Sequence, residues 1–201
     1  VSGKECVGGI IGSWNSSIYS YGSLTSTLTG FKNSGVITGT GDYVGGIMGY
    51  AYFDTSYEPT VNTVYMESFE NTGDVTGVNH VGGLLGYGGT DSAASYIEDS
   101  LCAAAITGNA YVGCIAGQLV FVQVNSCSNQ GSTLSATGYV TESLQKYAYV
   151  GGYVGRGYFA NNCINTVDVI YTSEGKYVGG IMGYTSAAGS FTLENLENRA
   201  T

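Results

Sequence analysis

VGGIIG, at residues 7–12, is the stretch that decides the fold, because close copies of it run through the whole chain of 201 residues. The six copies are VGGIIG at 7–12, VGGIMG at 44–49, VGGLLG at 81–86, VGCIAG at 112–117, VGGYVG at 150–155 and VGGIMG at 178–183. Self-similarity of this kind is the sequence signature of a repeat architecture. The repeat is therefore the unit from which the fold is built.

A second block precedes each hexapeptide and is clearest as FENTGDVTG at residues 69–77. Aligning the units gives one column that is mostly Asn: Asn33, Asn71, Cys102, Asn129, Asn165 and Asn198. The column two residues earlier holds Phe31, Phe69, Ser100, Cys127, Cys163 and Leu196. Successive hexapeptides are 37, 37, 31, 38 and 28 residues apart. The differences fall in the loops between the hexapeptide and the Asn column and in an insertion near residues 133–147.

Composition favours strands over helices. The chain has 33 glycines, 18 tyrosines and one proline, and 43% of its residues are hydrophobic. Each unit offers three short strand-like runs, such as residues 43–50, 63–71 and 75–77, and none of them has a helical period. One unit cannot bury its apolar face alone, whereas stacked units cover one another.

We therefore predict an all-β fold, a parallel β-solenoid of about six coils stacked ~4.8 Å apart, in one domain over residues 1–201. The crossover rule predicts right-handed coils. The alternative is a β-sandwich of Gly-rich hairpins. Equivalent positions in most units carry the same residue type, as stacking demands, and this favours the solenoid. Because the chain begins and ends inside a repeat, we expect it to be a fragment of a larger protein.

Two columns indicate how the coils are held together. An Asn at a coil corner can bond to its own turn and to the Asn of the next coil, so the Asn column predicts a structural ladder. The Gly-Gly pair allows a bend that brings the flanking Val and Ile to the same side. Glycine at such a bend allows a positive φ and a close approach of the backbone, and a positive φ at Gly46 or Gly83 would make replacement by Val strongly destabilising.

The charge of the chain excludes some classes of partner. The net charge is −9, from 6 basic and 15 acidic residues. Nucleic acid requires clustered Lys and Arg, and anionic membrane surfaces attract basic segments, so neither is an expected partner. No run of ~18 apolar residues is present, and we expect no membrane insertion of this segment.

No catalytic signature is present, and we expect a protein that is not an enzyme. His80 is the only histidine, so the two-histidine H-E-x-x-H zinc motif is excluded. His80 occupies a column otherwise made of tyrosines, which predicts a stacked solenoid side chain rather than a general base. We expect no catalytic residue, no metal site and no cofactor.

The five cysteines form no C-x-x-C pair, which argues against a structural zinc site. Cys127 and Cys163 share a column in successive units and could lie close enough for a disulfide. Stacked inward thiols fit the same column, since free Cys behaves as a small buried hydrophobe. The column leaves both possibilities open and favours free thiols.

Acidic residues gather where Glu67 and Glu98 align in neighbouring units, with Asp99 and Glu70 nearby. Such oxygens could bind calcium, and paired carboxylates could cleave glycosides. A solvated acidic edge is the favoured interpretation, because few basic residues accompany the carboxylates.

The aromatic residues are the best candidates for binding. Tyrosines flank the hexapeptide on both sides, and they form either an exposed platform or part of the core. Two long early loops, residues 12–33 and 49–71, are rich in aromatic residues. Aromatic residues on variable loops of a rigid scaffold predict a binding site, here Trp14, Tyr19, Tyr21, Tyr52, Phe53 and Tyr57.

The pattern N-x-G-x-V-x-G followed by Y-V-G-G-I/L-x-G-Y resembles the GLUG motif. This repeat is found in bacterial secreted and cell-surface proteins, including immunoglobulin A metallopeptidases and large adhesin-like proteins. The resemblance covers nearly the whole chain, with departures at Cys114 and Tyr153, which replace Gly and Ile of the hexapeptide.

The resemblance implies a non-catalytic structural or adhesive module of a secreted or cell-surface bacterial protein. Its loops would bind host glycoprotein or glycan, or neighbouring domains of the same chain, or the module would act as a stalk. One alternative is an accessory region of a larger secreted peptidase with catalysis elsewhere. Another is a β-helix that acts on polysaccharides.

Overall fold

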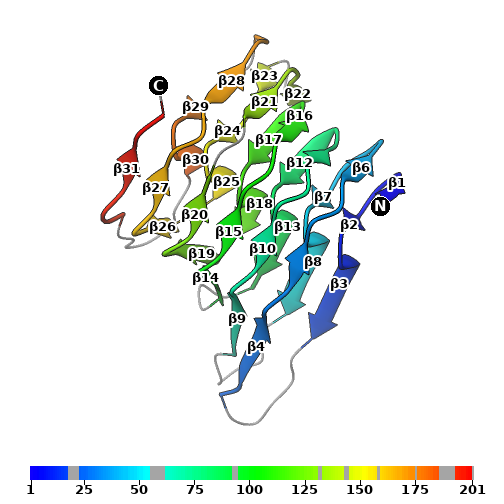
Figure 1. The fold of residues 1–201 in the computed structure, drawn as a ribbon, viewed down its shortest axis with the longest axis vertical. Helices are drawn as coiled ribbons and strands as arrows, with labels where there is room; N and C mark the ends of the chain where they lie inside the picture. The colour runs from blue at the N-terminus through cyan, green and yellow to red at the C-terminus, as the bar shows by residue number, and fades with distance from the viewer. Residues whose placement is uncertain are drawn as a thin grey trace.

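The chain folds into strands and turns that wind into a stack of coils (Figure 1). The structure is a computed structural model, and it describes residues 1–17, 23–54, 62–91, 95–130, 133–142, 145–157, 159–174, 176–185 and 193–200. No helix occurs in these ranges. It follows that none of the described segments is a helix able to cross a membrane.

Each coil passes through five parallel sheets, which we name A to E in chain order. Sheet A contains β1 (Ser2–Gly3), β6 (Ile37–Gly39), β11 (Val75–Thr76), β16 (Ile106–Gly108), β21 (Leu134–Ala136) and β28 (Val169–Tyr171). Sheet B contains β2 (Val7–Gly8), β7 (Val44–Gly45), β12 (Asn79–Gly82), β17 (Ala110–Gly113), β24 (Val150–Gly151) and β29 (Val178–Gly179). Sheet C contains β3 (Ile11–Ser17), β8 (Met48–Asp54), β13 (Leu85–Thr90), β18 (Ala116–Val120), β25 (Val154–Gly157) and β30 (Met182–Thr185).

The last two sheets complete each coil. Sheet D contains β4 (Thr25–Thr29), β9 (Thr63–Glu67), β14 (Ser95–Glu98), β19 (Val122–Asn125) and β26 (Phe159–Asn161). Sheet E contains β5 (Lys32–Asn33), β10 (Glu70–Asn71), β15 (Leu101–Cys102), β20 (Ser128–Asn129), β27 (Ile164–Asn165) and β31 (Glu197–Asn198). A single antiparallel hairpin, β22 (Val140–Glu142) and β23 (Gln145–Tyr147), accounts for the insertion in the fourth unit.

Residues at equivalent positions of the repeat pair with one another in the sheets, and we call each such set a file. The first valine of the hexapeptide pairs in register through all six units. The predicted parallel β-solenoid is confirmed, with four six-stranded sheets and the five-stranded sheet D wound over about five turns, and the β-sandwich alternative is wrong.

The core lies inside the coils and is built from apolar files. Ile37, Val75, Ile106 and Leu134 form one such file, and none of them is exposed. In β8 the buried Ala51 and Phe53 alternate with outward-facing tyrosines, as a period of two requires. Each coil therefore buries its apolar side chains against its neighbours.

The glycines of the hexapeptide are required for close approach rather than for a left-handed bend. A Cβ atom added to Gly46 would lie 2.1 Å from the Gly83 carbonyl oxygen and 2.4 Å from the Asn71 amide. The expectation of a positive φ at Gly46 or Gly83 is wrong, because Gly30, at 75°, is the glycine with positive φ in the described ranges. Left-handed residues instead recur at two places in the repeat. One set lies just before the hexapeptide, on Cys6, Tyr43, His80, Tyr111 and Tyr177, and the other lies between sheets D and E, on Ser68, Asp99, Ser126, Asn162 and Asn195.

The Asn column forms the predicted ladder along sheet E. Asn33 Nδ2 donates to Asn71 Oδ1 at 2.7 Å. Asn129 Nδ2 donates to Asn165 Oδ1 at 2.6 Å, and Asn165 Nδ2 donates to Asn198 Oδ1 at 2.7 Å. Cys102 interrupts the ladder at the third coil. Every amide–amide bond points from one coil to the next in chain order, so the ladder has a direction.

Replacing Gly46 with Val should lower the free energy of unfolding by about 3 kcal/mol or more, because the new side chain would occupy the space of the Gly83 carbonyl and the Asn71 amide. Chemical denaturation measures the loss. Gly35→Ala is the matched control, since its Cβ would meet only Asn33 Oδ1, at 3.6 Å. Equal losses in the two variants would contradict this account of the hexapeptide glycines.

Replacing Asn165 with Ala should cost about 3 kcal/mol, because it leaves buried partners unsatisfied. Asn165 is fully buried, and its amide bonds both to its neighbours in the ladder and to the turn at Val167. Asn198→Ala, at the exposed end of the ladder, should cost about 1 kcal/mol in the same denaturation experiment. The ladder would not be stabilising if both variants unfolded like the wild type.

Candidate binding surface

A column of stacked rings runs along the corner just before the hexapeptide. Its members, which we call the corner stack, are Tyr43, His80, Tyr111, Tyr149 and Tyr177. Successive ring centroids lie 4.8, 4.4, 4.5 and 5.4 Å apart, with interplanar angles of 14 to 30°. The coil spacing of a parallel sheet is what allows these rings to meet face to face.

A second row of side chains lies beside the corner stack on the outer face of sheet C. This sheet C row consists of Tyr50, Tyr87, Gln118, Arg156 and Tyr184, which pair in register. Each member directly follows the last glycine of its hexapeptide, and this position is the signal by which Gln118 and Arg156 could have been found from the sequence.

Side chains of the two rows contact one another. The Tyr43 and Tyr50 rings meet edge to face at 5.4 Å, and Tyr50 stacks on Tyr87 at 5.0 Å. The Arg156 guanidinium lies 5.4 Å from the ring centroid of Tyr149, within the range of a cation–π interaction. Together the two rows make a band of aromatic side chains whose positions are set by mutual contact.

The band is neither a pure core nor an open platform. Tyr111 and Tyr149 are buried, while Tyr43, Tyr50 and Tyr87 are half-buried. Because the ring faces of the corner stack, and those of Tyr50 and Tyr87, stack on one another, a ligand would meet ring edges and hydroxyl groups there rather than ring faces. Such edges favour a partner that offers hydrogen-bonding groups together with small apolar patches.

His80 is a stacked side chain, as its column predicts. Its ring lies between Tyr43 and Tyr111, and Nε2 lies 3.1 Å from Gln118 Oε1. Burial lowers the pKa of His80, while Asp42 and the Gln118 contact partly oppose that shift. The stacking on both ring faces and the contact with Gln118 place His80 within the row of rings.

The aromatic residues predicted to bind from loops do not form one surface. Trp14 and Phe53 lie on strands β3 and β8 and point inward, with ring centroids 6.4 Å apart. Tyr52, next to Phe53, faces the opposite side of sheet C. Its hydroxyl donates to Asp91, and this hydrogen bond, with burial, raises the pKa of Tyr52 to about 12. Tyr19, Tyr21 and Tyr57 lie outside the described residues.

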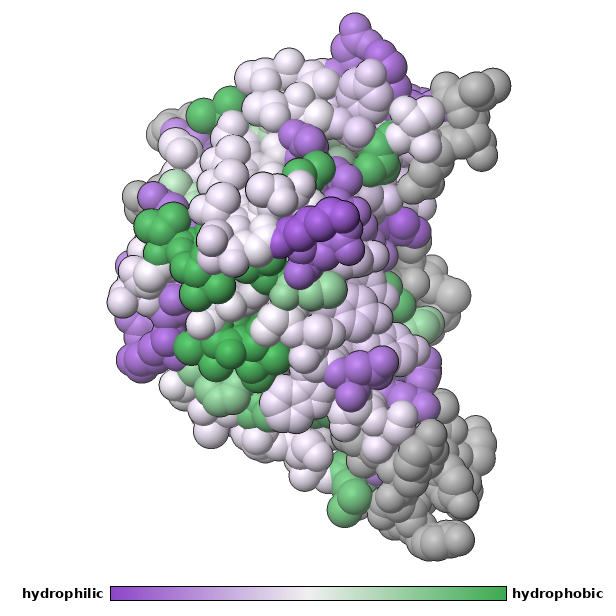
Figure 2. Space-filling view, turned by 90° about the vertical axis from the view of Figure 1, so that its right-hand side faces the viewer, coloured by the Kyte–Doolittle hydropathy of each residue, from purple (hydrophilic) through white to green (hydrophobic). Residues whose placement is uncertain are grey.

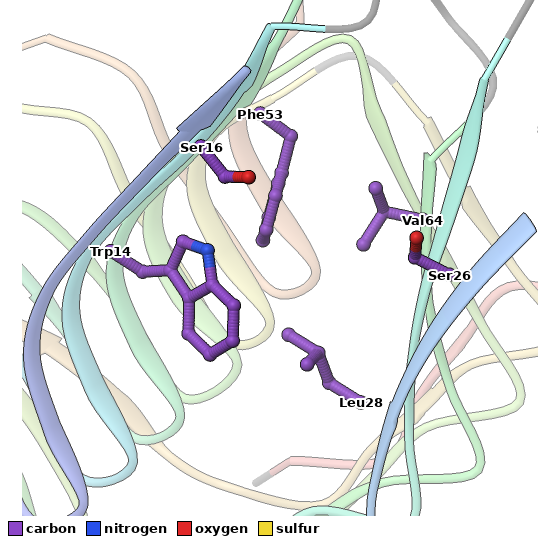
Figure 3. A pocket seen from close by; sticks show the side chains of 6 residues that line it. All are labelled: Trp14, Ser16, Ser26, Leu28, Phe53 and Val64. Atoms are coloured by element: carbon purple, nitrogen blue, oxygen red, sulfur yellow. The ribbon is translucent and has the colours of Figure 1, made fainter. Parts of the chain in front are cut away.

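Trp14 and Phe53 line a cavity of about 80 Å³ between sheets C and D at the first coil. Figure 3 shows Trp14, Phe53 and Ser16 on one wall and Leu28, Ser26 and Val64 on the other, pointing toward one another. Ser16 and Ser26 of the first coil pair in register with the larger Phe53 and Val64 of the second coil. The cavity is therefore space that the first coil leaves unfilled at the end of the core.

At the acidic edge, Glu67 and Glu98 are half-buried on the outer face of sheet D. Glu67 and Glu98 are neighbours in register on sheet D, and Glu98 Oε1 accepts a hydrogen bond from Asn125 Nδ2 at 2.8 Å. Across the described parts of the chain, no three His, Cys, Asp or Glu side chains come together in a group that could hold a metal ion.

All five cysteines are free thiols. Cys102 replaces an Asn of the ladder, and Cys114 replaces a hexapeptide glycine. The two thiols are joined by a hydrogen bond. This hydrogen bond and complete burial raise the pKa of Cys114 well above its usual value. Burial likewise raises the pKa of Cys127, and that of Cys163 to about 11. Thiols of this kind are packing groups with little nucleophilic character.

In the folded protein, at most one thiol should react with Ellman's reagent at pH 8, because Cys6 alone is not buried and the others lack accessible thiolate. All five should react in guanidinium chloride. The measurement is the absorbance of the released thiolate against time. Rapid reaction of two or more thiols in the native protein would contradict the packing described for them.

The sequence matches no protein-family model, and neither a similar curated protein nor a similar solved structure was found.

Proposed function

We propose that this chain is a non-catalytic structural and adhesive module of a secreted or cell-surface bacterial protein. Its binding surface would be the aromatic band, and its partner a host glycoprotein or glycan. The observation that supports this proposal is the band itself, two adjoining rows of mostly tyrosine side chains that contact one another on the outside of the stacked sheets. The likeness of the repeats to the GLUG motif supports the cellular location.

Preorganisation is the physical basis of the proposal. A tyrosine that is already stacked loses little conformational freedom when a partner binds, so more of the contact energy is expressed as affinity. Tyrosine offers an apolar ring edge and a hydroxyl group at the same position, which suits the mixed surface of a carbohydrate or of a glycoprotein. The net charge of −9 disfavours strongly acidic glycans and favours neutral or basic surfaces.

The test is binding of the purified chain to a panel of neutral and acidic glycans, mucin and immunoglobulin A. We expect saturable binding to a neutral glycan or glycoprotein. The double variant Tyr50→Ser and Tyr87→Ser should weaken this binding about tenfold or more, since aromatic side chains dominate such contacts. Biolayer interferometry measures the dissociation constants.

The matched control is the double variant Tyr65→Ser and Tyr96→Ser. These rings stack in the same manner, at 5.1 Å and 14°, but on the outer face of sheet D. Binding that is lost equally in both double variants, or that survives in the first, would refute the aromatic band as the site. A folded chain that binds nothing on the panel would favour a stalk, or an accessory segment of a larger secreted peptidase.

A further inference from the structure

Arg156 differs from the other basic side chains of the protein. Four of the six basic residues pair with carboxylates, and Lys176 Nζ donates to Gln145 Oε1 at 3.1 Å. The Arg156 guanidinium has neither an ion pair nor a hydrogen bond to the described residues. It lies over the rings of Tyr149 and Tyr184, at 5.4 and 5.7 Å from their centroids. A guanidinium carries five N–H donors in a planar fork, and here no acceptor of the described residues uses them.

Gln118 supplies a second donor group beside Arg156. The two residues pair in register on β18 and β25 of sheet C. Gln118 Oε1 accepts from His80 Nε2 at 3.1 Å, because a carbonyl oxygen has no proton to donate. Gln118 Nε2, with its two N–H donors, has no acceptor among the described residues and is left for another partner.

The donors of both residues are open to solvent. Both side chains are half-buried. The buried side-chain atoms without a partner in the described ranges are Asn79 Oδ1, His80 Nδ1 and Ser95 Oγ, and neither Arg156 nor Gln118 contributes one. Strand β25 has β18 on one side and β30 on the other, so this surface lies within sheet C. Figure 1 places β25 away from the first coil, whose side of the molecule Figure 2 shows as mixed polar and apolar surface.

Hydrogen-bond donors beside a positive charge, without a competing acceptor, fit a carboxylate. A guanidinium binds a carboxylate through two parallel N–H···O bonds, and such charge-assisted bonds are stronger than neutral ones. The rings of Tyr149 and Tyr184 restrict the guanidinium before any ligand arrives, which reduces the entropy lost on binding. Tyrosine hydroxyl groups and ring edges beside the guanidinium suit the hydroxyl groups and C–H groups of a sugar.

The charge of the protein limits the ligand to few negative charges. A net charge of −9 repels strongly acidic glycans, whereas a single carboxylate is compensated locally by Arg156. Exposed charges more than about 8 Å away are largely screened at physiological ionic strength. The local positive charge therefore decides the binding of a ligand with one carboxylate.

We propose that Arg156 and Gln118 form a binding site for a sugar that carries one carboxylate. The guanidinium would bind the carboxylate through two N–H groups, Gln118 Nε2 would donate to one of the same oxygens, and Tyr184 would contact the sugar ring. This site goes beyond the proposed function, because it assigns a separate ligand chemistry to this part of the sheet C row. It does not require a neutral glycan to bind at Tyr50 and Tyr87.

The experiment is a titration of the protein at constant pH with the methyl α-glycoside of N-acetylneuraminic acid. NMR spectra follow the ring C–H signals of His80, which is the only histidine and contacts Gln118. The wild type should show a saturable shift of these signals. The methyl ester of the same sugar, which lacks the negative charge, should bind about tenfold more weakly or less. Because the readout follows this sugar alone, it is independent of the outcome with neutral glycans.

Arg156→Gln should weaken binding of the acid about tenfold or more, and Arg156→Lys should restore part of the affinity, since Lys keeps the charge and loses the planar fork. Arg199→Gln is the matched control, because it removes the same charge from an arginine that pairs with Glu197 at 2.7 Å. It should bind the acid as the wild type does, and circular dichroism verifies the fold of each variant.

Three outcomes would overturn the carboxylate site: no saturable shift in the folded wild type, equal binding of the acid and its methyl ester, or equal losses in Arg156→Gln and Arg199→Gln. Acetate and N-acetylaspartate test the source of the carboxylate. Both should bind more weakly than the sugar, because they offer nothing to the tyrosine. Equal affinity for these simple carboxylates would overturn the assignment of a sugar as the ligand.

Discussion

The stacking of the coils depends on the absence of a side chain at the second glycine of the hexapeptide. At the second glycine of the hexapeptide, the carbonyl group of the next coil and the Asn amide of the same coil occupy the volume that a Cβ atom would need. This close approach lets one buried amide satisfy its own turn and its neighbour at the same time. The register of the valine file and the direction of the ladder both follow from that contact. At Gly46, any other residue would bring a carbon atom to within 2.1 Å of the Gly83 carbonyl oxygen.

The one exception shows how strict the constraint is. Where Cys114 stands in place of a hexapeptide glycine, Cys102 of the preceding coil stands in place of the ladder Asn. The thiols of Cys102 and Cys114 are joined by a hydrogen bond inside the core, and the ladder is interrupted between Asn71 and Asn129. The backbone of Cys102 still pairs in register with Asn71 on one side and with Asn129 on the other. The coil stack thus accommodates a side chain at this hexapeptide position together with the loss of one Asn from the ladder.

Much of the fold could be predicted from the sequence, because stacking makes equivalent positions alike. The parallel coils, the Asn ladder and the placement of His80 in a ring stack all follow from columns of the alignment. The location of the left-handed residues could not be predicted, since Tyr43 and its equivalents adopt a conformation that bulky residues rarely use. The inward orientation of Trp14 and Phe53 was also missed. Long strands extend there into segments that the repeat pattern alone assigns to loops.

The hairpin in the fourth unit has a consequence for how such a protein can change over evolutionary time. It adds residues between Val112 and Val150, yet these two valines pair as their counterparts do elsewhere. Each coil needs to match only the coils above and below it, so extra residues can leave the stack and return without shifting the register. Insertions and deletions are thus confined to the rim. The outer loops can diversify while the positions that specify the coil stay the same.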